Sequence, residues 1–199
     1  MTRPLLFATT NPGKLRELRA LAGGLSVISL EDFPGIADVV EDEETLEGNA
    51  RKKALAYART TGVTALADDS GLCVDALGGR PGVHSARYAP GDDAARWQKL
   101  LQEMKDVPEG ERTASFQCAL CLATPEGDVT SEVGRCEGRV LHAARGTGGF
   151  GYDPVLWVTQ LGRAMAELTL EEKALVSHRG QAFARMRARL LDYQEGRWP

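Results

Sequence analysis

Two adjacent carboxylates, Asp68 and Asp69, follow the apolar run 63–67 and precede Ser70-Gly71. We expect residues 63–67 to form a strand that ends at this acid pair. Open α/β sheets bind ligands beyond the carboxyl ends of their strands, so both acids are predicted to lie at a ligand site. Carboxylates there suit a hard cation such as Mg²⁺, which in turn holds phosphate oxygens. A solvated polar turn is the alternative interpretation.

A second candidate is the turn that follows the first apolar strand, 5–8. It consists of Thr9, Thr10, Asn11, Pro12, Gly13 and Lys14. Backbone amides at a helix N-terminus attract anions, and Lys14 adds a positive charge. The segment is not a P-loop, because the first glycine and the Ser or Thr after the lysine are both missing. It indicates either a phosphate contact or a simple helix-initiating turn.

The glycine-rich segment 146–151 fits G-x-G-x-x-G letter for letter. A dinucleotide site is not indicated, since no apolar strand runs directly into it and Asp153-Pro154 follows where a helix should begin. Glycines let backbone approach a ligand, and Phe150 and Tyr152 offer flat faces for a base. A flexible loop is the alternative.

The motif Ser177-His178-Arg179-Gly180 begins the last expected helix. Arg179 can donate in-plane hydrogen bonds to a carbonyl or a phosphate. Lys173, in the preceding short helix, is within reach of the same place. Each feature alone is compatible with surface decoration, but three separate anion- or base-binding loops favour one nucleotide site.

The composition argues against several classes of protein. The 199 residues are 43% hydrophobic and 26% charged, which indicates one domain with a full core. The net charge of −4, with no run of Lys or Arg, argues against a nucleic-acid partner. The sequence contains no stretch of ~18 apolar residues and no signal-peptide pattern, so we expect a cytoplasmic protein with no membrane partner.

The elements that must position these residues alternate between strands and helices. Strands are expected over 5–8, 27–30, 63–67, 112–123, 128–136 and 155–158, the fourth and fifth forming an antiparallel hairpin. Helices are expected from Lys14 to about 22, from an N-cap at Thr45 to about 61, from 92 to about 104, after the capping box 169–172, and after Ser177. The sum is an α/β fold with a mixed sheet.

Two further patterns bear on the chemistry. On the second helix, Thr45, Asn49 and Lys53 form a polar stripe beside a buried apolar one. Cys118 and Cys121 form a C-x-x-C within the expected strand 112–123. Positions three apart point to opposite faces of a strand, so we expect two small buried residues rather than a metal site or a disulfide.

Six ordered motifs resemble those of the inosine/xanthosine triphosphate pyrophosphatases, which hydrolyse non-standard purine nucleoside triphosphates. They are Thr10-Asn11-Pro-Gly-Lys14, Thr45-Leu-Glu-Gly-Asn49-Ala-Arg-Lys-Lys53-Ala54, Asp68-Asp69-Ser70-Gly71-Leu72, Gly78-Gly79-Arg-Pro81-Gly82-Val-His-Ser85-Ala86-Arg87-Tyr88, Gly148-Gly149-Phe150-Gly151-Tyr152-Asp153-Pro154 and Ser177-His178-Arg179-Gly180. The resemblance extends from about Leu5 to about Arg189.

The resemblance implies an elongated mixed β-sheet with flanking helices and two lobes around a central cleft, all in one domain over 1–199, and a homodimer. It implies that a nucleoside triphosphate and water give the monophosphate and pyrophosphate, with Mg²⁺ as cofactor. The implied catalytic residues are Asp69 and Lys53, and the implied metal ligands are Asp69 and Glu41. The implied substrate contacts are Thr9, Thr10, Asn11, Pro12, Gly13, Lys14, Ser70, Phe150, Gly151, Tyr152, Asp153, Lys173, His178 and Arg179.

Base selection is expected to come from donors that face the carbonyl at purine position 6, where adenine carries an amine. Arg179 and the loop amides around Phe150 are the expected donors, with Phe150 or Tyr152 stacked on the ring. His84 stands where an aromatic residue is usual, and the acidic run 41–44 leaves the second metal acid open by a few positions. The alternatives are a Maf-type pyrophosphatase, which prefers modified pyrimidines, and a non-catalytic nucleotide sensor on the same scaffold.

Overall fold

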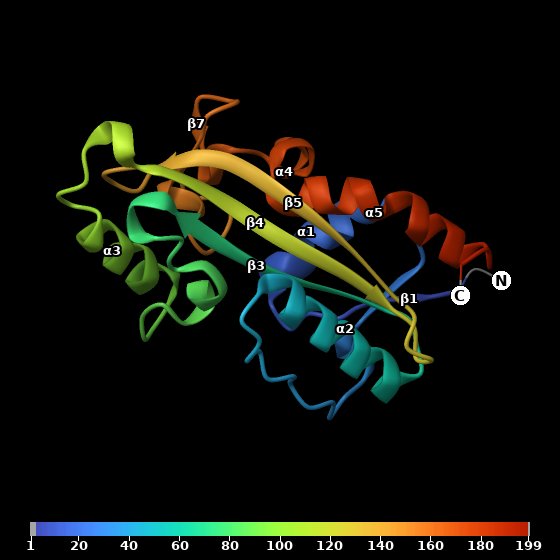
Figure 1. The fold of residues 1–199 in the computed structure, drawn as a ribbon. Helices are drawn as coiled ribbons and strands as arrows, with labels where there is room; N and C mark the ends of the chain where they lie inside the picture. Colours follow the sequence, from blue (N-terminus) through green and yellow to red (C-terminus); the bar gives the residue numbers. More distant parts are fainter. Residues whose placement is uncertain (1–2, 199) are drawn as a thin grey trace.

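One mixed sheet organises the chain, which the computed structural model describes over residues 3–198 (Figure 1). Its strand order is β2-β1-β3-β4-β5-β6-β7. The strands are β1 (Leu5–Phe7), β2 (Val27–Ser29), β3 (Ala65–Val74), β4 (Thr113–Ala123), β5 (Val129–Val140), β6 (Leu156–Val158) and β7 (Arg163–Ala164). β1 runs parallel to β2 and β3, and every later pair of neighbours is antiparallel. The predicted elongated α/β fold with a mixed sheet is confirmed.

Helices cover both faces of the long strands. They are α1 (Pro12–Ala22), α2 (Leu46–Thr61), α3 (Asp93–Glu103), α4 (Leu170–Val176) and α5 (His178–Gln194), joined in places by short 3₁₀ turns such as η3 (Gly82–Arg87). α1 and α5 pack on one face and α2 on the other, whereas α3 lies at the end of the molecule away from both termini (Figure 1). The distal lobe is the part around α3, and the proximal lobe contains α1, α2 and α5.

The predicted helix starts are confirmed at three caps. The side chains of Thr45, Thr169 and Ser177 accept hydrogen bonds from backbone N–H groups in the first turns of α2, α4 and α5. α1 begins at Pro12, two residues before its predicted start. Asn11 caps it, and proline is favoured in a first helical turn because its missing N–H has no helical partner there.

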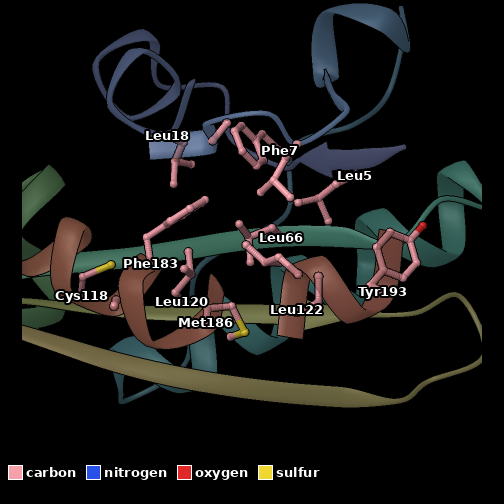
Figure 2. Close-up of a cluster of buried hydrophobic side chains, with 14 of the residues drawn as sticks. Leu5, Phe7, Leu18, Leu66, Cys118, Leu120, Leu122, Phe183, Met186 and Tyr193 are labelled. Atoms are coloured by element: carbon pink, nitrogen blue, oxygen red, sulfur yellow. The ribbon is translucent and has the colours of Figure 1, made fainter. Parts of the chain in front are cut away.

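Three apolar clusters join the layers. The first packs Phe7, Leu18, Leu66, Leu120 and Phe183 between the sheet and the helices α1 and α5 (Figure 2). The second lies on the other face and consists largely of alanines from α2, β3 and β4, which lets α2 approach the strands closely. The third fills the distal lobe. Side chains that alternate along β3 therefore meet different helices on its two faces.

β3 differs from its prediction. The sequence predicts a strand that ends at Ala67, but the structure continues it to Val74, so Asp68 and Asp69 lie inside the strand. The long ladder with β4 explains the extension, because it satisfies the backbone groups of these polar residues. The pairing of β1 with β3 stops at Leu66. Both acids therefore still lie past the carboxyl end of the central parallel strand.

β4 and β5 form the predicted antiparallel hairpin. β5 extends to Val140 rather than 136, because residues 138–140 also pair with β6 on its other edge. Cys118 and Cys121 are buried in the clusters on opposite faces of β4, as predicted. The two-residue strand β7 was not predicted, since it is too short to show an alternating pattern.

Candidate active site

A cavity of about 950 Å³ is lined by residues of both lobes. It brings together most of the predicted site residues: Thr9, Thr10, Asn11, Lys14, Glu41, Lys53, Asp69, Ser70, Phe150, Gly151, Tyr152, Asp153, His178 and Arg179. Pro12, Gly13 and Lys173 do not line it. Pro12 and Gly13 belong to the first turn of α1, and Lys173 is buried beneath the cavity wall.

Asp69 lines the cavity from the α2 face of β3. One carboxylate oxygen accepts from the Ser70 N–H at 2.9 Å, and the other accepts from Asn49 Nδ2 at 3.0 Å. Burial raises the pKa of Asp69, and although Lys14 and Lys53 oppose this effect, the charge of Glu41 adds to it. A buried carboxyl group with a raised pKa at a cavity wall is suited to accept a proton from water or to bind a cation.

Asp68 points to the opposite face, toward α1 and α5. Its Oδ2 lies 2.8 Å from Arg179 Nη2 and 3.2 Å from Lys14 Nζ, and it accepts from Ser70 Oγ at 2.8 Å. Burial disfavours the charge of Asp68, but Lys14, Arg179 and Lys53 together hold its pKa below the usual range. Asp68 is thus an ionised counter-ion inside the protein, whereas Asp69 lines the cavity.

Two lysines from opposite faces of the sheet meet at the backbone of Asp68. Lys53 of α2 donates to the Asp68 carbonyl oxygen at 2.6 Å, and Lys14 of α1 donates to it at 3.5 Å. Burial disfavours the charge of Lys53, but Asp68 and Glu41 keep its pKa raised. Both side chains line the cavity, so they present two fixed positive charges to an anionic ligand.

The acidic segment 38–44 forms another wall of the cavity. Glu41 forms an ion pair with Lys53, and its carbonyl oxygen accepts from Arg87 Nη2 at 3.1 Å. The Glu43 N–H donates to Asn49 Oδ1 at 3.0 Å. Asp42 pairs instead with Lys52, at an exposed position. Within the run 41–44, the contacts favour Glu41 as the acid that acts together with Asp69, because Asn49 and Lys53 tie both to α2.

The carboxylates of Asp69 and Glu41 fit a Mg²⁺ ion that also binds phosphate. Among residues 3–198, no three His, Cys, Asp or Glu side chains are grouped as a metal cage. Mg²⁺ commonly uses one or two carboxylates together with water and substrate phosphates. Asp69 and Glu41 supply two carboxylates, and the charge of Glu41 contributes to the raised pKa of Asp69. The residues present therefore fit an ion that binds together with a phosphate ligand.

The ring of Phe150 also lines the cavity. It is so close to α1 that a Cβ on Gly13 would lie 2.5 Å from Phe150 Cδ1. Lys173 Nζ and Arg179 Cζ lie 5.4 Å and 5.8 Å from the ring centroid. The half-buried ring thus rests on a glycine and beside two cations, in a place where it can stack on a base.

The backbone amides of this loop are already engaged. The Phe150 N–H donates to Asp153 Oδ2 at 2.9 Å, and the Gly151 N–H donates to Asp93 Oδ2 at 2.6 Å. These two amides are not free to bind a purine carbonyl, which corrects the prediction that they do. The Tyr152 ring is buried and its hydroxyl donates to the Ser85 carbonyl at 2.9 Å. Phe150 is therefore the better stacking surface.

A network of ion pairs forms part of the cavity wall. Glu17 of α1, which is 5% exposed, pairs with both Arg179 and Lys173. Lys173 Nζ also lies 2.8 Å from Asp153 Oδ2. Burial disfavours the charge of Lys173, but Asp153 and Glu17 keep its pKa raised. This network of ion pairs consists of Asp68, Arg179, Glu17, Lys173 and Asp153. It joins β3 to α5, α1 and α4, and to the segment 146–153, which we call the Phe150 loop.

Most N–H donors of Arg179 are already used within this network of ion pairs. Its Nε and Nη2 donate to Asp68 Oδ2 at 3.2 Å and 2.8 Å, Nη2 also donates to Ser70 Oγ at 3.1 Å, and Nη1 donates to Glu17. Four of the five guanidinium N–H groups are used in this way. One N–H on Nη1 remains for a ligand. The prediction that Arg179 contacts the base therefore rests on a single donor.

His178 is buried against Phe116, with ring centroids 4.7 Å apart and planes 17° from parallel. Burial, together with the charges of Arg179 and Lys173, holds the pKa of His178 well below 6.5. The imidazole is neutral at physiological pH, and its Nδ1 has no hydrogen-bond partner within residues 3–198. His178 thus offers the cavity a neutral ring rather than a charge.

Several polar residues of this cavity were not predicted, among them Glu17, Arg87, Asp93 and Arg96. Glu17 lies three positions after Lys14, between Leu15 and Leu18, so a charged residue on the buried stripe of α1 was the available signal. Arg87 lies within one of the six motifs, but the resemblance implies no role for it. Asp93 falls within the helix expected from 92 to about 104, and no local pattern indicates its contact with Gly151.

Comparisons with known proteins agree on one family. The model of the Ham1 family matches residues 5–189. The dITP/XTP pyrophosphatase of Geobacter sulfurreducens is 52% identical over 194 residues, which cover 96% of this chain and 97% of that protein. A HAM1 protein from Coxiella burnetii has a solved structure that superposes with a TM-score of 0.86 at 37% identity, covering 96% of this chain and 99% of the other.

A structure described as the nucleoside-triphosphatase, dITP/XTP pyrophosphatase, of Mycobacterium abscessus is also similar. It is 45% identical to this chain with a TM-score of 0.74, and the match covers 92% of this chain and 98% of the other. Sequence and structure therefore match over nearly the whole length of these proteins.

Proposed function

This chain belongs to the Ham1 family, and we propose that its cavity hydrolyses non-standard purine nucleoside triphosphates such as ITP, dITP and XTP. The products are the nucleoside monophosphate and pyrophosphate, so the chain is a hydrolase that acts on phosphoanhydride bonds and cleanses the nucleotide pool. One observation carries the proposal: Asp69 shares a cavity with Lys14, Lys53 and the Phe150 ring, in a chain 52% identical to a dITP/XTP pyrophosphatase.

The chain's own residues supply most of the chemistry. Lys14 and Lys53 hold the triphosphate oxygens, and Phe150 stacks on the base. Asp69 orients a water molecule and accepts its proton as the oxygen attacks the α-phosphorus. The bond from the α-phosphorus to the bridging oxygen breaks, and pyrophosphate leaves with that electron pair. Positioning and charge do most of the work, because phosphoryl transfer requires little covalent help from the protein.

The cofactor in this proposal is Mg²⁺, held by Asp69 and Glu41 together with substrate phosphates. When bound, it supplies positive charge that neutralises the leaving pyrophosphate. The raised pKa of Asp69 supports this proposal, since a carboxylate that burial and Glu41 disfavour gains stability beside a cation.

The other classes considered for this sequence are not favoured. The family match is to Ham1 over residues 5–189, not to the Maf-type pyrophosphatases. A non-catalytic sensor would need the phosphate-binding turn but not the acid, and Asp69 is present at the cavity wall.

The proposal extends to the setting of the enzyme. We propose a homodimer on the basis of the family resemblance. The net charge of −4 argues against a nucleic-acid partner, and a sequence without a long apolar stretch or a signal-peptide pattern favours a cytoplasmic protein with no membrane partner. No helix within residues 3–198 is both long and apolar enough to cross a membrane. Light scattering at micromolar concentration tests the dimer, and a monomer mass contradicts it.

Product analysis tests the reaction. The protein is incubated with Mg²⁺ and ITP, dITP, XTP, ATP or GTP in turn, and nucleotides and phosphates are separated by chromatography. We expect IMP and pyrophosphate from ITP, with free phosphate only after a pyrophosphatase is added. IDP with free phosphate would mean attack at the γ-phosphorus and would overturn the proposal.

A further inference from the structure

A contact between α3 and the Phe150 loop has no role in the chemistry described so far. Asp93, in the first turn of α3, accepts the Gly151 N–H on Oδ2 at 2.6 Å. Its Oδ1 accepts from Arg96 Nη1, also at 2.6 Å, and Arg96 Nη2 donates to the Gly91 carbonyl at 2.9 Å. Arg96 thereby holds the carboxylate in one orientation. Both Asp93 and Arg96 line the cavity.

The position of the Gly151 amide affects the position of the Phe150 ring. Gly151 has φ of +60°, a conformation that favours glycine, so the direction of its N–H depends on a backbone geometry that other residues rarely adopt. The residue before it carries the ring that packs on Gly13 and lies beside Lys173 and Arg179. A shift of this peptide therefore moves the Phe150 ring.

Other contacts hold the residues next to Gly151. The Phe150 N–H and Lys173 both bind Asp153, and the Tyr152 hydroxyl binds the Ser85 carbonyl. Together with the Asp153 N–H, which donates to the Phe150 carbonyl at 3.2 Å, these contacts hold residues 150, 152 and 153, whereas Asp93 holds the Gly151 N–H from the distal lobe. The Asp93 side chain is 44% exposed, so it contributes little to the core and its contact is poorly explained by packing alone.

We propose that Asp93 is a positioning residue for nucleotide binding: by holding the Gly151 amide, it sets the place of the Phe150 ring and so the affinity for the purine. The inference rests on the proposed function. It assigns part of base binding to α3, which otherwise only covers the distal lobe. Asp93 forms no hydrogen bond with Lys14, Lys53 or Asp69, the residues proposed to act on the phosphates, so its loss should weaken binding and leave the chemical step intact.

The neighbouring acid provides a matched control. Asp92 is the N-cap of the same helix, and its Oδ1 accepts from the Ala95 N–H at 2.9 Å. It does not line the cavity. Asp92→Ala therefore weakens α3 as much as any loss at Asp93 while leaving Gly151 held. A merely structural role of Asp93 predicts the same behaviour for the two alanine variants.

The experiment compares the full-length wild type with Asp93→Ala, Asp93→Asn and Asp92→Ala. Four quantities are measured: hydrogen exchange of the amides in 146–153, KM and kcat for ITP with Mg²⁺, and the affinity for IMP by calorimetry without metal. For Asp93→Ala we expect faster loop exchange, and a KM and an IMP dissociation constant about tenfold or more higher, as for loss of a charge-assisted hydrogen bond. The value of kcat should change by less than about threefold.

The other variants sharpen the test. Asp93→Asn should recover part of the affinity, because its carboxamide oxygen still accepts the Gly151 N–H. Asp92→Ala should match the wild type in loop exchange, KM and IMP affinity. If Asp93→Ala and Asp92→Ala are alike in an active protein, or if kcat rather than KM carries the loss, the inference is overturned. A wild type that neither hydrolyses ITP nor binds IMP overturns the proposed function itself.

Discussion

The adjacent acids Asp68 and Asp69 should respond in opposite ways to loss of charge, because alternation along β3 sends them to different surroundings. Asp68→Asn removes the counter-ion of Arg179 and Lys14 inside the protein. Removing one partner of a buried ion pair costs about 3–5 kcal/mol of unfolding free energy. Asparagine keeps one acceptor for the guanidinium, so we expect the lower end, about 3 kcal/mol.

That loss is large enough to measure directly. For a chain of this length, each kcal/mol lowers Tm by about 2–4 °C, so the variant should melt about 6–12 °C below the wild type. The effect should also depend on pH. The folded-state pKa of Asp68 is depressed, so its charge stabilises the protein above its unfolded-state pKa, and this contribution is lost as pH falls through the folded-state pKa. The gap in Tm between wild type and variant should therefore shrink in acid.

Asp69→Asn should instead keep the stability of the protein and lose its activity. The folded-state pKa of Asp69 is raised, so at neutral pH its charge reduces stability, and removing it offsets the poorer hydrogen bonding of an amide facing Asn49 and the Ser70 N–H. We expect the unfolding free energy to stay within about 1 kcal/mol of the wild type. Activity on ITP should fall at least about a hundredfold, the scale of losing a positioned base.

Urea unfolding followed by tryptophan fluorescence, with ITP turnover on the same samples, checks both halves. The reasoning fails if Asp68→Asn is as stable as the wild type, or if Asp69→Asn is the less stable of the two. An Asp69→Asn variant with near-normal turnover would remove Asp69 from the chemistry.

Three further perturbations follow from the site. In a pH-rate profile, the acid limb of kcat/KM should lie at higher pH than the pKa of a free aspartate. Asn49→Ala should move this limb to still higher pH, because the Asn49 hydrogen bond lowers the pKa of Asp69. A limb that does not move would exclude Asp69 as the titrating group. Gly13→Ala should displace the Phe150 ring and raise KM for ITP about tenfold without weakening α1, which steady-state kinetics and a melting curve can check. Chelation of Mg²⁺ should abolish turnover and leave Tm nearly unchanged, since no group of three or more His, Cys, Asp or Glu side chains within residues 3–198 could hold a structural metal ion. A large fall in Tm would indicate a structural ion.

Local signals in the sequence predicted the elements that carry the site. The caps at Thr45, Thr169 and Ser177 are short-range hydrogen bonds between residues three apart, so nearby residues suffice to identify them. The end of β3 could not be predicted in this way. Residues 68–71 are polar and small, and they remain in a strand because β4, some fifty positions away in the chain, supplies the ladder.

The same error concealed the difference between the two acids. In a turn, adjacent aspartates can share a ligand, whereas in a strand they face opposite sides. The prediction that both lie at one ligand site was therefore wrong for Asp68, which binds Arg179 and Lys14. The partners of Glu17 were equally beyond local reasoning, because Lys173 and Arg179 come from helices at the other end of the chain.

The continuity of β3 and β4 has a mechanical consequence for the cavity. Leu66 and Leu120 lie in the proximal core, whereas Leu72 and Phe116, on the same two strands, lie in the distal core. No linker joins the lobes along these strands, so rotating one lobe against the other means bending a hydrogen-bonded ribbon rather than turning a hinge. The cavity should keep its width whether empty or filled, and the two lobes should unfold in one cooperative step.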